Sequence, residues 1–140
     1  MEFPLTLHLS MVQDKARMRA FTRALKTVIK PGCTVVDIGT GTGVLAFMAA
    51  RLGAGTVIGL ERSDIVERAR KVQRINFPRA QIHFEKLDVL TDRLPKVQAD
   101  IVVCELLGNF GLEENMITVL SKVRDKLLKP GGILIPSQVE

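Results

Sequence analysis

Hydrophobic residues follow two patterns that alternate along the chain. Short continuous apolar runs are typical of strands buried on both faces of a sheet, and apolar residues that recur every three or four positions are typical of amphipathic helices. The apolar runs predict strands at residues 34–38, 56–60, 100–104 and 133–135, and the alternation of apolar Ile82 and Phe84 predicts a further strand at 81–85. The periodic segments predict helices over 11–29, from 44 to the glycines at 53 and 55, from 65 onward, and over 116–128. This order predicts an α/β fold with a doubly wound, mostly parallel sheet of about five strands and an N-terminal helix.

Turn and capping residues mark the ends of the predicted elements. Pro31-Gly32 ends the first helix, and Ser63 and Asp64 can cap the third. The inward-facing residues of that third helix are expected to be Ile65, Ala69 and Val72. Pro130-Gly131-Gly132 stops the last helix, and residues 86–98 fit either a short helix or a loop.

Length and composition bound the class of protein. A chain of 140 residues with 46% hydrophobic and 25% charged residues, without repeats or linkers, is expected to form a single soluble domain over residues 1–140. The two cysteines, Cys33 and Cys104, fit a reducing compartment. No apolar run approaches the roughly 20 residues that span a bilayer, and the N-terminus lacks the features of a secretory signal. We therefore expect a cytoplasmic protein without a membrane segment or a bound metal.

The net charge of +5 and the pI near 9.6 raise the question of an acidic partner. Many of the basic residues fall on the first and third predicted helices, at 15–30 and 62–74. A solvated helix face explains most runs of this kind, and basicity is only the first of several criteria for nucleic-acid binding. No nucleic-acid recognition motif accompanies the charge. A solvated face is the favoured interpretation, with nucleic acid and other acidic partners left open.

The segment from Asp37 to Gly43, DIGTGTG, follows the first predicted strand and precedes a helix. Glycines there let the backbone turn sharply and approach a ligand without Cβ clashes. Dinucleotide-binding loops carry G-x-G-x-x-G at this place, but the third glycine of that pattern would fall at Val44. The spacing is instead D-x-G-x-G-x-G, with Gly39 and Gly41 before Gly43. This spacing disfavours a nicotinamide cofactor.

Two glutamates end strands that are expected to flank the first strand or lie near it. Glu61 ends the second strand, 18 residues after Gly43, where a carboxylate can accept hydrogen bonds from both hydroxyls of a ribose. That contact supports a nucleoside ligand without choosing between cofactors. Glu105 ends the fourth strand, which in a doubly wound sheet lies beside the first, at the switch point where ligands bind.

The D-x-G-x-G-x-G segment resembles the S-adenosylmethionine-dependent methyltransferase superfamily, whose domains have a Rossmann-like sheet. Residues 8–17, HLSMVQDKAR, followed by Phe21, look like the H-x-x-M-L-x-D-x-x-R-x-x-x-Y segment of protein arginine methyltransferases. Residues 105–116 are similar to that family's paired-glutamate loop, E-x-x-G-x-x-x-x-x-E-x-M, and 128–136 match its closing strand. The resemblance covers nearly the whole chain and implies the family's cofactor-binding domain.

The resemblance assigns cofactor-binding roles to residues at matching positions. It implies that Arg17 pairs with the methionyl carboxylate of S-adenosylmethionine, which suits a fork of donors. Asp37 would lie near the methionyl part of the cofactor. Leu87 and Asp88 follow the third strand, where methyltransferases of this kind place an acid near the adenine amino group.

The resemblance also assigns the substrate side. Glu105 and Glu114 would grip a substrate guanidinium, draw its positive charge toward themselves and leave one nitrogen electron-rich. Met11 and Asp14 would fall on the same side of the site. The other interpretation of Glu113 and Glu114 is that they are ordinary acidic residues, which are favoured at a helix N-terminus.

Arginine methyltransferases continue into a β-barrel domain that helps to bind the peptide, and we expect that domain to be absent here. The preferred hypothesis is an arginine-methyltransferase-like enzyme whose acceptor, on a protein, peptide or small molecule, carries a guanidinium or amine group. A homodimer or a partner subunit could complete the site. The alternative is a non-catalytic cofactor-binding module, or a subunit whose substrate domain lies on another chain. A nucleic-acid methyltransferase is a weaker alternative, because ELLG at 105–108 stands where the N-P-P-Y-type motif would be.

Overall fold

The computed structural model describes residues 15–104 and 114–137, with side chains of the second segment described from Met116 onward. The elements follow one another as predicted, strand alternating with helix except between the third and fourth strands. In chain order they are α2 (Lys15–Val28), β1 (Thr34–Ile38), α3 (Val44–Arg51), β2 (Thr56–Glu61), α4 (Val66–Asn76), β3 (Ile82–Lys86), β4 (Ala99–Cys104), α5 (Glu114–Lys126) and β5 (Leu128–Ile135).

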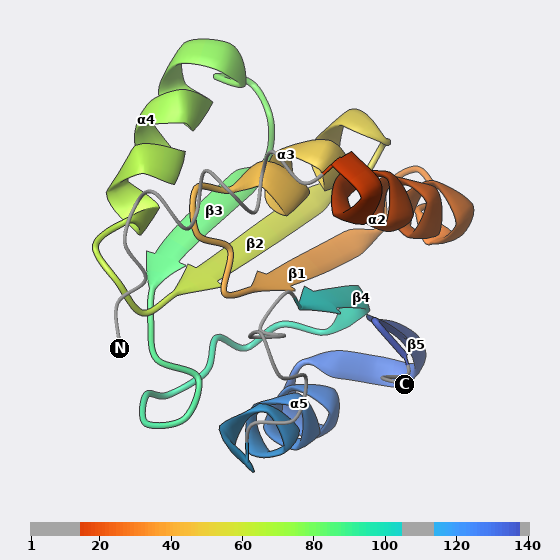
Figure 1. Ribbon diagram of the computed structural model, residues 1–140, viewed down its shortest axis with the longest axis vertical. Helices are drawn as coiled ribbons and strands as arrows, with labels where there is room; N and C mark the ends of the chain where they lie inside the picture. The colour runs from red at the N-terminus through yellow and green to blue at the C-terminus, as the bar shows by residue number, and fades with distance from the viewer. Residues whose placement is uncertain (1–14, 105–113, 138–140) are drawn as a thin grey trace.

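The strands form one parallel sheet in the order β3-β2-β1-β4-β5 (Figure 1). The chain builds outward from β1 to β3 and then crosses back to place β4 on the other side of β1. This doubly wound order confirms the predicted fold class. Ligands bind to such sheets at the carboxyl ends of the strands where the winding direction reverses, which here lies between β1 and β4.

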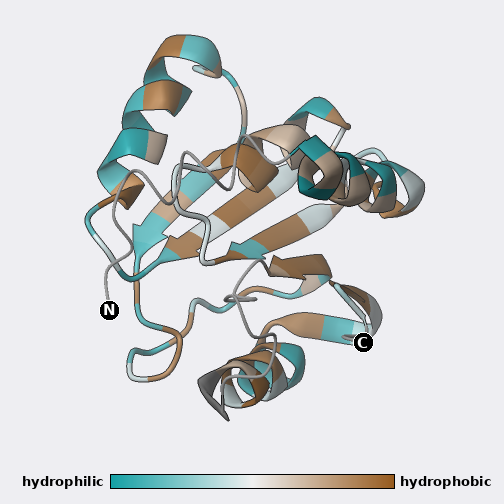
Figure 2. Cartoon of the chain, viewed as in Figure 1, coloured by the Kyte–Doolittle hydropathy of each residue, from teal (hydrophilic) through white to brown (hydrophobic). Residues whose placement is uncertain are grey.

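Helices cover the sheet on both faces, with α2, α3 and α4 on one face and α5 on the other (Figure 1). Alternate residues of β1, β2 and β4 serve the two cores, whereas β3 contributes Ile82 and Phe84 to one core and exposes the residues between and after them. Val35 of β1 packs in the core that contains Leu25 of α2 and Phe47 of α3, whereas Val36 packs with Val123 of α5. Burial on both faces explains why β1, β2 and β4 are rich in apolar residues, seen as brown bands in Figure 2. Among the described helices, none combines the length and apolar composition needed to cross a membrane.

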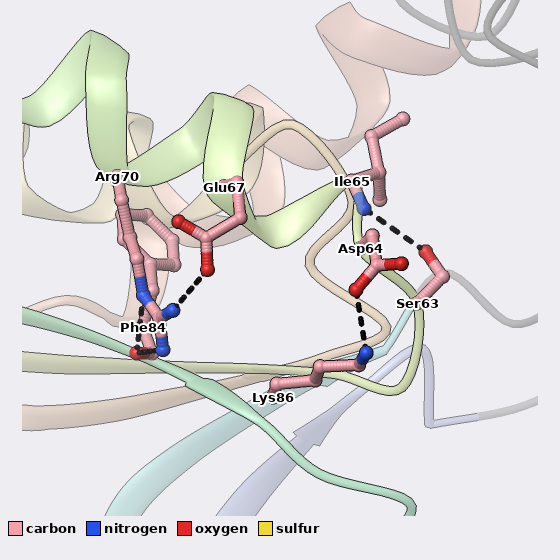
Figure 3. Close-up of polar contacts among 7 residues, drawn as sticks. All are labelled: Ser63, Asp64, Ile65, Glu67, Arg70, Phe84 and Lys86. Atoms are coloured by element: carbon pink, nitrogen blue, oxygen red, sulfur yellow. Dashed lines mark hydrogen bonds and ion pairs between the residues drawn. The ribbon is translucent and has the colours of Figure 1, made fainter.

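Side chains at the start of α4 contact β3, an edge strand of the described sheet (Figure 3). Arg70 donates to the carbonyl oxygen of Phe84 through Nε at 3.2 Å and through Nη2 at 2.8 Å. Glu67 pairs with Arg70, and Asp64 pairs with Lys86 at the end of β3. These contacts fix α4 against β3, and with it the turn that connects α4 to β2.

Asp100 joins three strands at the amino edge of the sheet. Its Oδ2 accepts a hydrogen bond from the Thr34 N–H of β1 at 2.8 Å, and its Oδ1 lies 3.0 Å from Lys129 Nζ of β5. The hydrogen bond from Thr34, followed by the contact with Lys129, holds the pKa of the Asp100 carboxyl below its usual range. An acid at this edge therefore has a structural explanation.

The predicted side-chain cap of α4 is wrong. The helix begins after Ile65 without a side-chain hydrogen bond to its first turn. Asp64 pairs with Lys86 instead, and Ser63 Oγ accepts from the N–H of Ile65 at 3.4 Å, one residue before the helix (Figure 3). Asp64 thus forms an ion pair with Lys86 of β3 and does not cap the helix.

The predicted inward face of α4 is correct at Ala69 and wrong at Val72, which is 37% exposed. Val66 and Ala69 are the buried residues of the helix. Val72 lies about 120° from Val66 around the helix axis, so it turns away from the sheet. The predicted apolar face began at Ile65, one residue before Val66, which is the first buried residue of the helix.

The end of α5 also differs from the prediction. The helix ends at Lys126, and Leu128, predicted as its last apolar residue, begins β5 by pairing with Ala99. Residues 130–132, predicted to stop the helix, lie inside β5 at an irregularity in its register with β4. The segment 86–98 forms turns and loop after the end of β3, which decides between the two predicted alternatives.

We expect Leu25→Ala to lower the free energy of unfolding by about 2–5 kcal/mol, because a fully buried leucine would leave a cavity between α2 and the sheet. Ile75→Ala is the control: Ile75 is 69% exposed, and the change is expected to stay within about 0.5 kcal/mol. Urea unfolding followed by circular dichroism measures both. Similar small values for the two variants would contradict the docking of α2 on this core.

Candidate functional site

The turn between β1 and α3 contains three glycines in the left-handed region of backbone conformation. Gly39, Gly41 and Gly43 have φ values of 69°, 57° and 88°. Residues with a Cβ rarely adopt these values, whereas glycine does so without steric cost. The turn carries the chain from the buried end of β1 to the start of α3 at Val44. The sharp turn predicted from the glycine spacing is confirmed.

Buried polar side chains gather at this turn. Among the residues whose burial the structure describes, the buried polar or charged ones are Asp37, Thr40 and Glu61. Asp37 is 1% exposed and Glu61 is 9% exposed. Thr40 Oγ1 donates a hydrogen bond to Asp37 Oδ2 at 2.7 Å. Asp and Glu side chains are almost never fully buried unless they are paired. The gathering of buried polar side chains at this turn therefore makes it the candidate functional site.

Glu61 ties the turn to the end of β2. Its Oε2 accepts a hydrogen bond from the N–H of Gly41 at 2.9 Å, and its Oε1 accepts one from the N–H of Ser63 at 3.1 Å. Asp37 pairs with Gly59 in the register of β1 and β2, so Asp37 and Glu61 lie near the carboxyl ends of neighbouring strands. Two of the predicted site residues are thus brought to one edge of the sheet beside the glycine turn.

Most N–H groups of the turn donate within the protein. Gly39 and Thr40 both donate to the carbonyl oxygen of Leu60, at 2.8 and 3.0 Å. Gly43 donates to the Thr40 carbonyl at 2.8 Å, and Gly41 donates to the carboxylate described above. A loop that binds a pyrophosphate instead directs such N–H groups at its ligand. The geometry of this turn therefore agrees with the glycine spacing in disfavouring a dinucleotide.

Two glycines leave room for the ring of Phe84 beside the turn. A Cβ at Gly59 of β2 would lie 2.6 Å from Phe84 Cδ1, and a Cβ at Gly43 would lie 2.9 Å from Phe84 Cζ. Phe84 therefore reaches from β3 across β2 to the turn that follows β1. The ring of Phe47 on α3 packs edge-on against it, with centroids 5.5 Å apart.

Sequence reasoning missed two residues that support the site, Gly59 and Thr40. A Cβ at Gly59 would lie 2.9 Å from Thr40 Oγ1, so the hydroxyl that holds Asp37 depends on the same empty space as the Phe84 ring. A lone glycine inside an apolar strand signals a close approach of other atoms, and the segment TVIGLE carried that signal. Thr40 gave no comparable signal, because a threonine among glycines is common in exposed turns.

Asp88 and Leu87 follow β3 as predicted, and Asp88 has a local structural role. Its Oδ1 accepts from the N–H of Leu90 at 2.9 Å, and its own N–H donates to Asp92 Oδ2 at 2.7 Å, as in an Asx turn. Leu87 is buried and donates its N–H to the Glu61 carbonyl at 2.9 Å. This bond places the pair beside the end of β2, while its contact with adenine stays a prediction.

The other predicted site residues lie at the limits of the described chain or beyond them. Arg17 is half-buried on α2. Glu114 is the first residue of α5, with its side chain outside the described part. Met11, Asp14 and Glu105 lie outside the described residues. Cys104, which precedes Glu105, pairs with Ile38 at the end of β1. Within the described residues, no cluster of His, Cys, Asp or Glu could hold a metal ion.

A doubly wound parallel sheet with a glycine turn and two buried carboxylates at its carboxyl edge defines a Rossmann-like α/β domain. The sequence matches the family described as Ribosomal protein L11 methyltransferase (PrmA) over residues 19–139. The chain belongs to this methyltransferase family.

Protein arginine methyltransferases are similar to the chain in both sequence and structure, which confirms the resemblance to their cofactor-binding domain. Protein arginine N-methyltransferase 1 of Dictyostelium discoideum is 35% identical over 134 residues, 94% of this chain and 39% of that protein. The crystal structure of protein arginine methyltransferase 10 of Arabidopsis thaliana superposes with a TM-score of 0.85 at 32% identity, covering 96% of this chain and 39% of that one. The PRMT1 enzyme–prozyme heterotetrameric complex of Trypanosoma brucei with AdoHcy gives a TM-score of 0.83 at 29% identity, covering 93% and 41%. The chain thus spans about two fifths of the length of these relatives.

Gly43→Ala is expected to destabilise the protein by about 2–5 kcal/mol, because the left-handed backbone and close contacts with Phe47, Phe84 and Ala69 all oppose a Cβ. Gly131→Ala is the matched control: its φ is 77°, but no atom lies within 4 Å of the place that a Cβ would occupy. It should therefore show the backbone effect alone, about 1–2 kcal/mol. Chemical denaturation measures both variants, and equal values would show that the close contacts around Gly43 add nothing to the backbone effect.

Proposed function

We propose that this chain binds S-adenosylmethionine at the carboxyl ends of β1 and β2 and transfers its methyl group to a guanidinium or amine nitrogen. The observation that carries the proposal is the pair of buried carboxylates, Asp37 and Glu61, on either side of a glycine turn in a methyltransferase-family domain. The proposal treats residues 1–140 as a single cofactor-binding domain.

Glu61 retains the capacity to hold a ribose. An ionised carboxylate offers about four lone-pair sites on its two oxygens, and the N–H groups of Gly41 and Ser63 use one site on each oxygen. One site on each oxygen remains for a hydroxyl. Two adjacent hydroxyls of one ribose match this pair, and hydrogen bonds to an ionised acceptor are of the stronger class.

The use of the turn's N–H groups inside the protein supports a cofactor without a phosphate at this position. Gly39, Thr40 and Gly43 donate to backbone carbonyls, which leaves few donors for a pyrophosphate. S-adenosylmethionine has a ribose and an adenine but no phosphate, and it supplies a methyl group on a positively charged sulfur. The AdoHcy named with the Trypanosoma brucei complex is in agreement with a cofactor of this type.

The remaining cofactor contacts are assigned by position. Arg17 on α2 would pair with the methionyl carboxylate, since a guanidinium offers a planar fork of donors. Asp37, held by the Thr40 hydroxyl, would face the methionyl part. Leu87 and Asp88 would lie near the adenine. The hydrogen bond from the Leu87 N–H to the Glu61 carbonyl supports this assignment, because it joins the end of β3 to the residue proposed to hold the ribose.

The acceptor is assigned to the end of β4 and the start of α5. Glu105 would follow β4 directly, beside β1 at the switch point of the sheet, and Glu114 begins α5. Two carboxylates there would hold a cationic guanidinium and orient one nitrogen, which is most of what a displacement reaction needs. Met11 and Asp14 would complete the substrate side.

A second candidate function is supported by one comparison. The Trypanosoma brucei relative is an enzyme–prozyme heterotetrameric complex. The chain would then be a cofactor-binding module, or a subunit that depends on a partner, or a second copy, for its substrate site.

We expect Glu61→Gln to weaken the binding of S-adenosylhomocysteine by about 10–100-fold, because a charge-assisted hydrogen bond contributes about 1.5–3 kcal/mol. Isothermal titration calorimetry measures the affinity. Glu85→Gln, the same change at an exposed position on β3, is expected to leave it unchanged. Tighter binding of NAD than of S-adenosylhomocysteine by the wild type would overturn the cofactor assignment.

We expect Glu105→Gln to reduce methyl transfer by about 100-fold, because a preorganised charge at the reacting group would be lost. The assay uses labelled S-adenosylmethionine with protein extracts and with free guanidino compounds as acceptors. Glu113→Gln, a neighbouring acid outside the paired-glutamate pattern, should retain full activity. Equal transfer by wild type and Glu105→Gln would remove Glu105 from catalysis. Cofactor binding without transfer to any acceptor would favour the second function.

A further inference from the structure

One side of α2 carries a row of basic residues. Lys15, Arg19, Arg23 and Lys26 are exposed and recur at intervals of four, four and three residues. At about 100° per residue they fall within about 80° of one another around the helix axis. Lys30, two residues past the helix, continues the same spacing. We call these five residues the α2 basic row.

The α2 basic row has no acidic neighbour on its own helix. The sequence of α2, KARMRAFTRALKTV, contains no acidic residue. Within the part of the chain that the structure describes, none of the five takes part in an ion pair. Like charges four residues apart, as in Lys15–Arg19 and Arg19–Arg23, oppose helix formation. The helix dipole favours a cation in the last turn, where Lys26 lies, but not at Lys15. Repulsion within the row is thus an unfavourable local effect that no acid on α2 offsets.

The charge of the whole chain is divided in the same way. Residues 15–80 hold 13 of the 20 Lys and Arg and 4 of the 15 Asp and Glu, a net charge of +9. The rest of the chain carries −4. Residues 15–80 include α2, α3 and α4, which share one face of the sheet, whereas α5 covers the other (Figure 1). The overall charge of +5 therefore conceals a strongly basic helical face.

We propose that the α2 basic row binds the phosphate backbone of a nucleic acid without reading its sequence. From Lys15 to Lys26 the row is about 16 Å long, a length over which one strand of a duplex presents about five phosphates. The exposed residues of α2 that lie beside the row are small or hydroxylic, such as Ala16, Ala20 and Thr27, and none is aromatic. They offer no stacking surface, and the row beside them presents positive charge, so binding rests on charge.

A membrane surface is a poorer match for α2. Binding to a bilayer needs an apolar face free to enter the interface, but the apolar side of α2 faces the protein core, where Leu25 is fully buried and Phe21 and Val28 pack around it. A nucleic acid needs the basic side alone.

The α2 basic row is separate from the cofactor site. Arg17, the residue of α2 assigned to the cofactor, lies about 160° from the middle of the row around the helix axis, and it is half-buried where the row is exposed. Changes to the row therefore leave the proposed cofactor contact in place.

The test is the salt dependence of binding to a fluorescein-labelled duplex of about 20 base pairs and mixed sequence, DNA in one arm and RNA in the other, measured by anisotropy with the full chain. Neutralising about five phosphates gives a plot of log K against log salt with a slope of about −4.5. The triple variant Arg19→Gln/Arg23→Gln/Lys26→Gln should reduce the slope to about −2 and weaken binding at least about tenfold at low salt. Glutamine retains a good helix propensity, and circular dichroism verifies folding.

The matched control is Arg93→Gln/Lys96→Gln/Lys126→Gln, which removes the same charge from exposed positions outside residues 15–80. Its slope should change by less than half of the change seen in the row variant. Equal losses in the two variants would assign binding to net charge and overturn the proposal. Tighter binding of polyglutamate than of either duplex at equal charge, or binding to phosphatidylserine vesicles without binding to a duplex, would also overturn it. A preference for one duplex sequence over another by more than about tenfold would contradict binding through the backbone alone.

Discussion

The packing of one aromatic ring against two glycines determines how the site is built. Phe84 lies on β3, two strands away from β1, yet its ring contacts the space where Cβ atoms of Gly59 and Gly43 would stand. Any side chain at Gly59 would displace the ring and the Thr40 hydroxyl together. The turn after β1 is thus supported by a ring from beyond its neighbouring strand, and Asp37, Thr40 and the start of α3 keep their positions through a contact that spans three strands.

Each edge of the sheet has a carboxylate that accepts hydrogen bonds, but the partners of the two carboxylates differ. At the amino edge, Asp100 accepts from Thr34 and contacts Lys129, so its charge is used to hold three strands. At the carboxyl edge, Glu61 accepts from Gly41 and Ser63 and still has acceptor capacity. A lysine side chain contacts one oxygen of Asp100, whereas each oxygen of Glu61 accepts from a backbone N–H group. This difference, rather than the presence of carboxylates, separates the site from the rest of the sheet.

Patterns of short range could be predicted from the sequence, and contacts between distant elements could not. The strand runs, the glycine turn and the place of Glu61 at the end of β2 depend on local periodicity and on the order of elements, and they agree with the structure. The predicted cap at Ser63 and Asp64 is wrong because Asp64 pairs with Lys86, a partner 22 residues away. The prediction that Leu128 belongs to the last helix is wrong because Leu128 pairs with Ala99 in the sheet, and this pairing competes with helix propensity. Gly59 was missed because its role depends on where the Phe84 ring lies, which no local pattern contains.

The two sides of α2 are subject to different constraints, because one side packs in the core and the other is exposed. Leu25 is fixed by packing, since a smaller residue would leave a cavity. The exposed side carries no such constraint, because lysine, glutamate or glutamine would be accommodated there with similar helix propensity. An amphipathic helix that only had to fold would gain from an acid four residues from a lysine, and α2 has none. The folded structure therefore explains the apolar side of α2 and leaves its basic side unexplained, so the origin of that charge is to be sought in what the helix contacts.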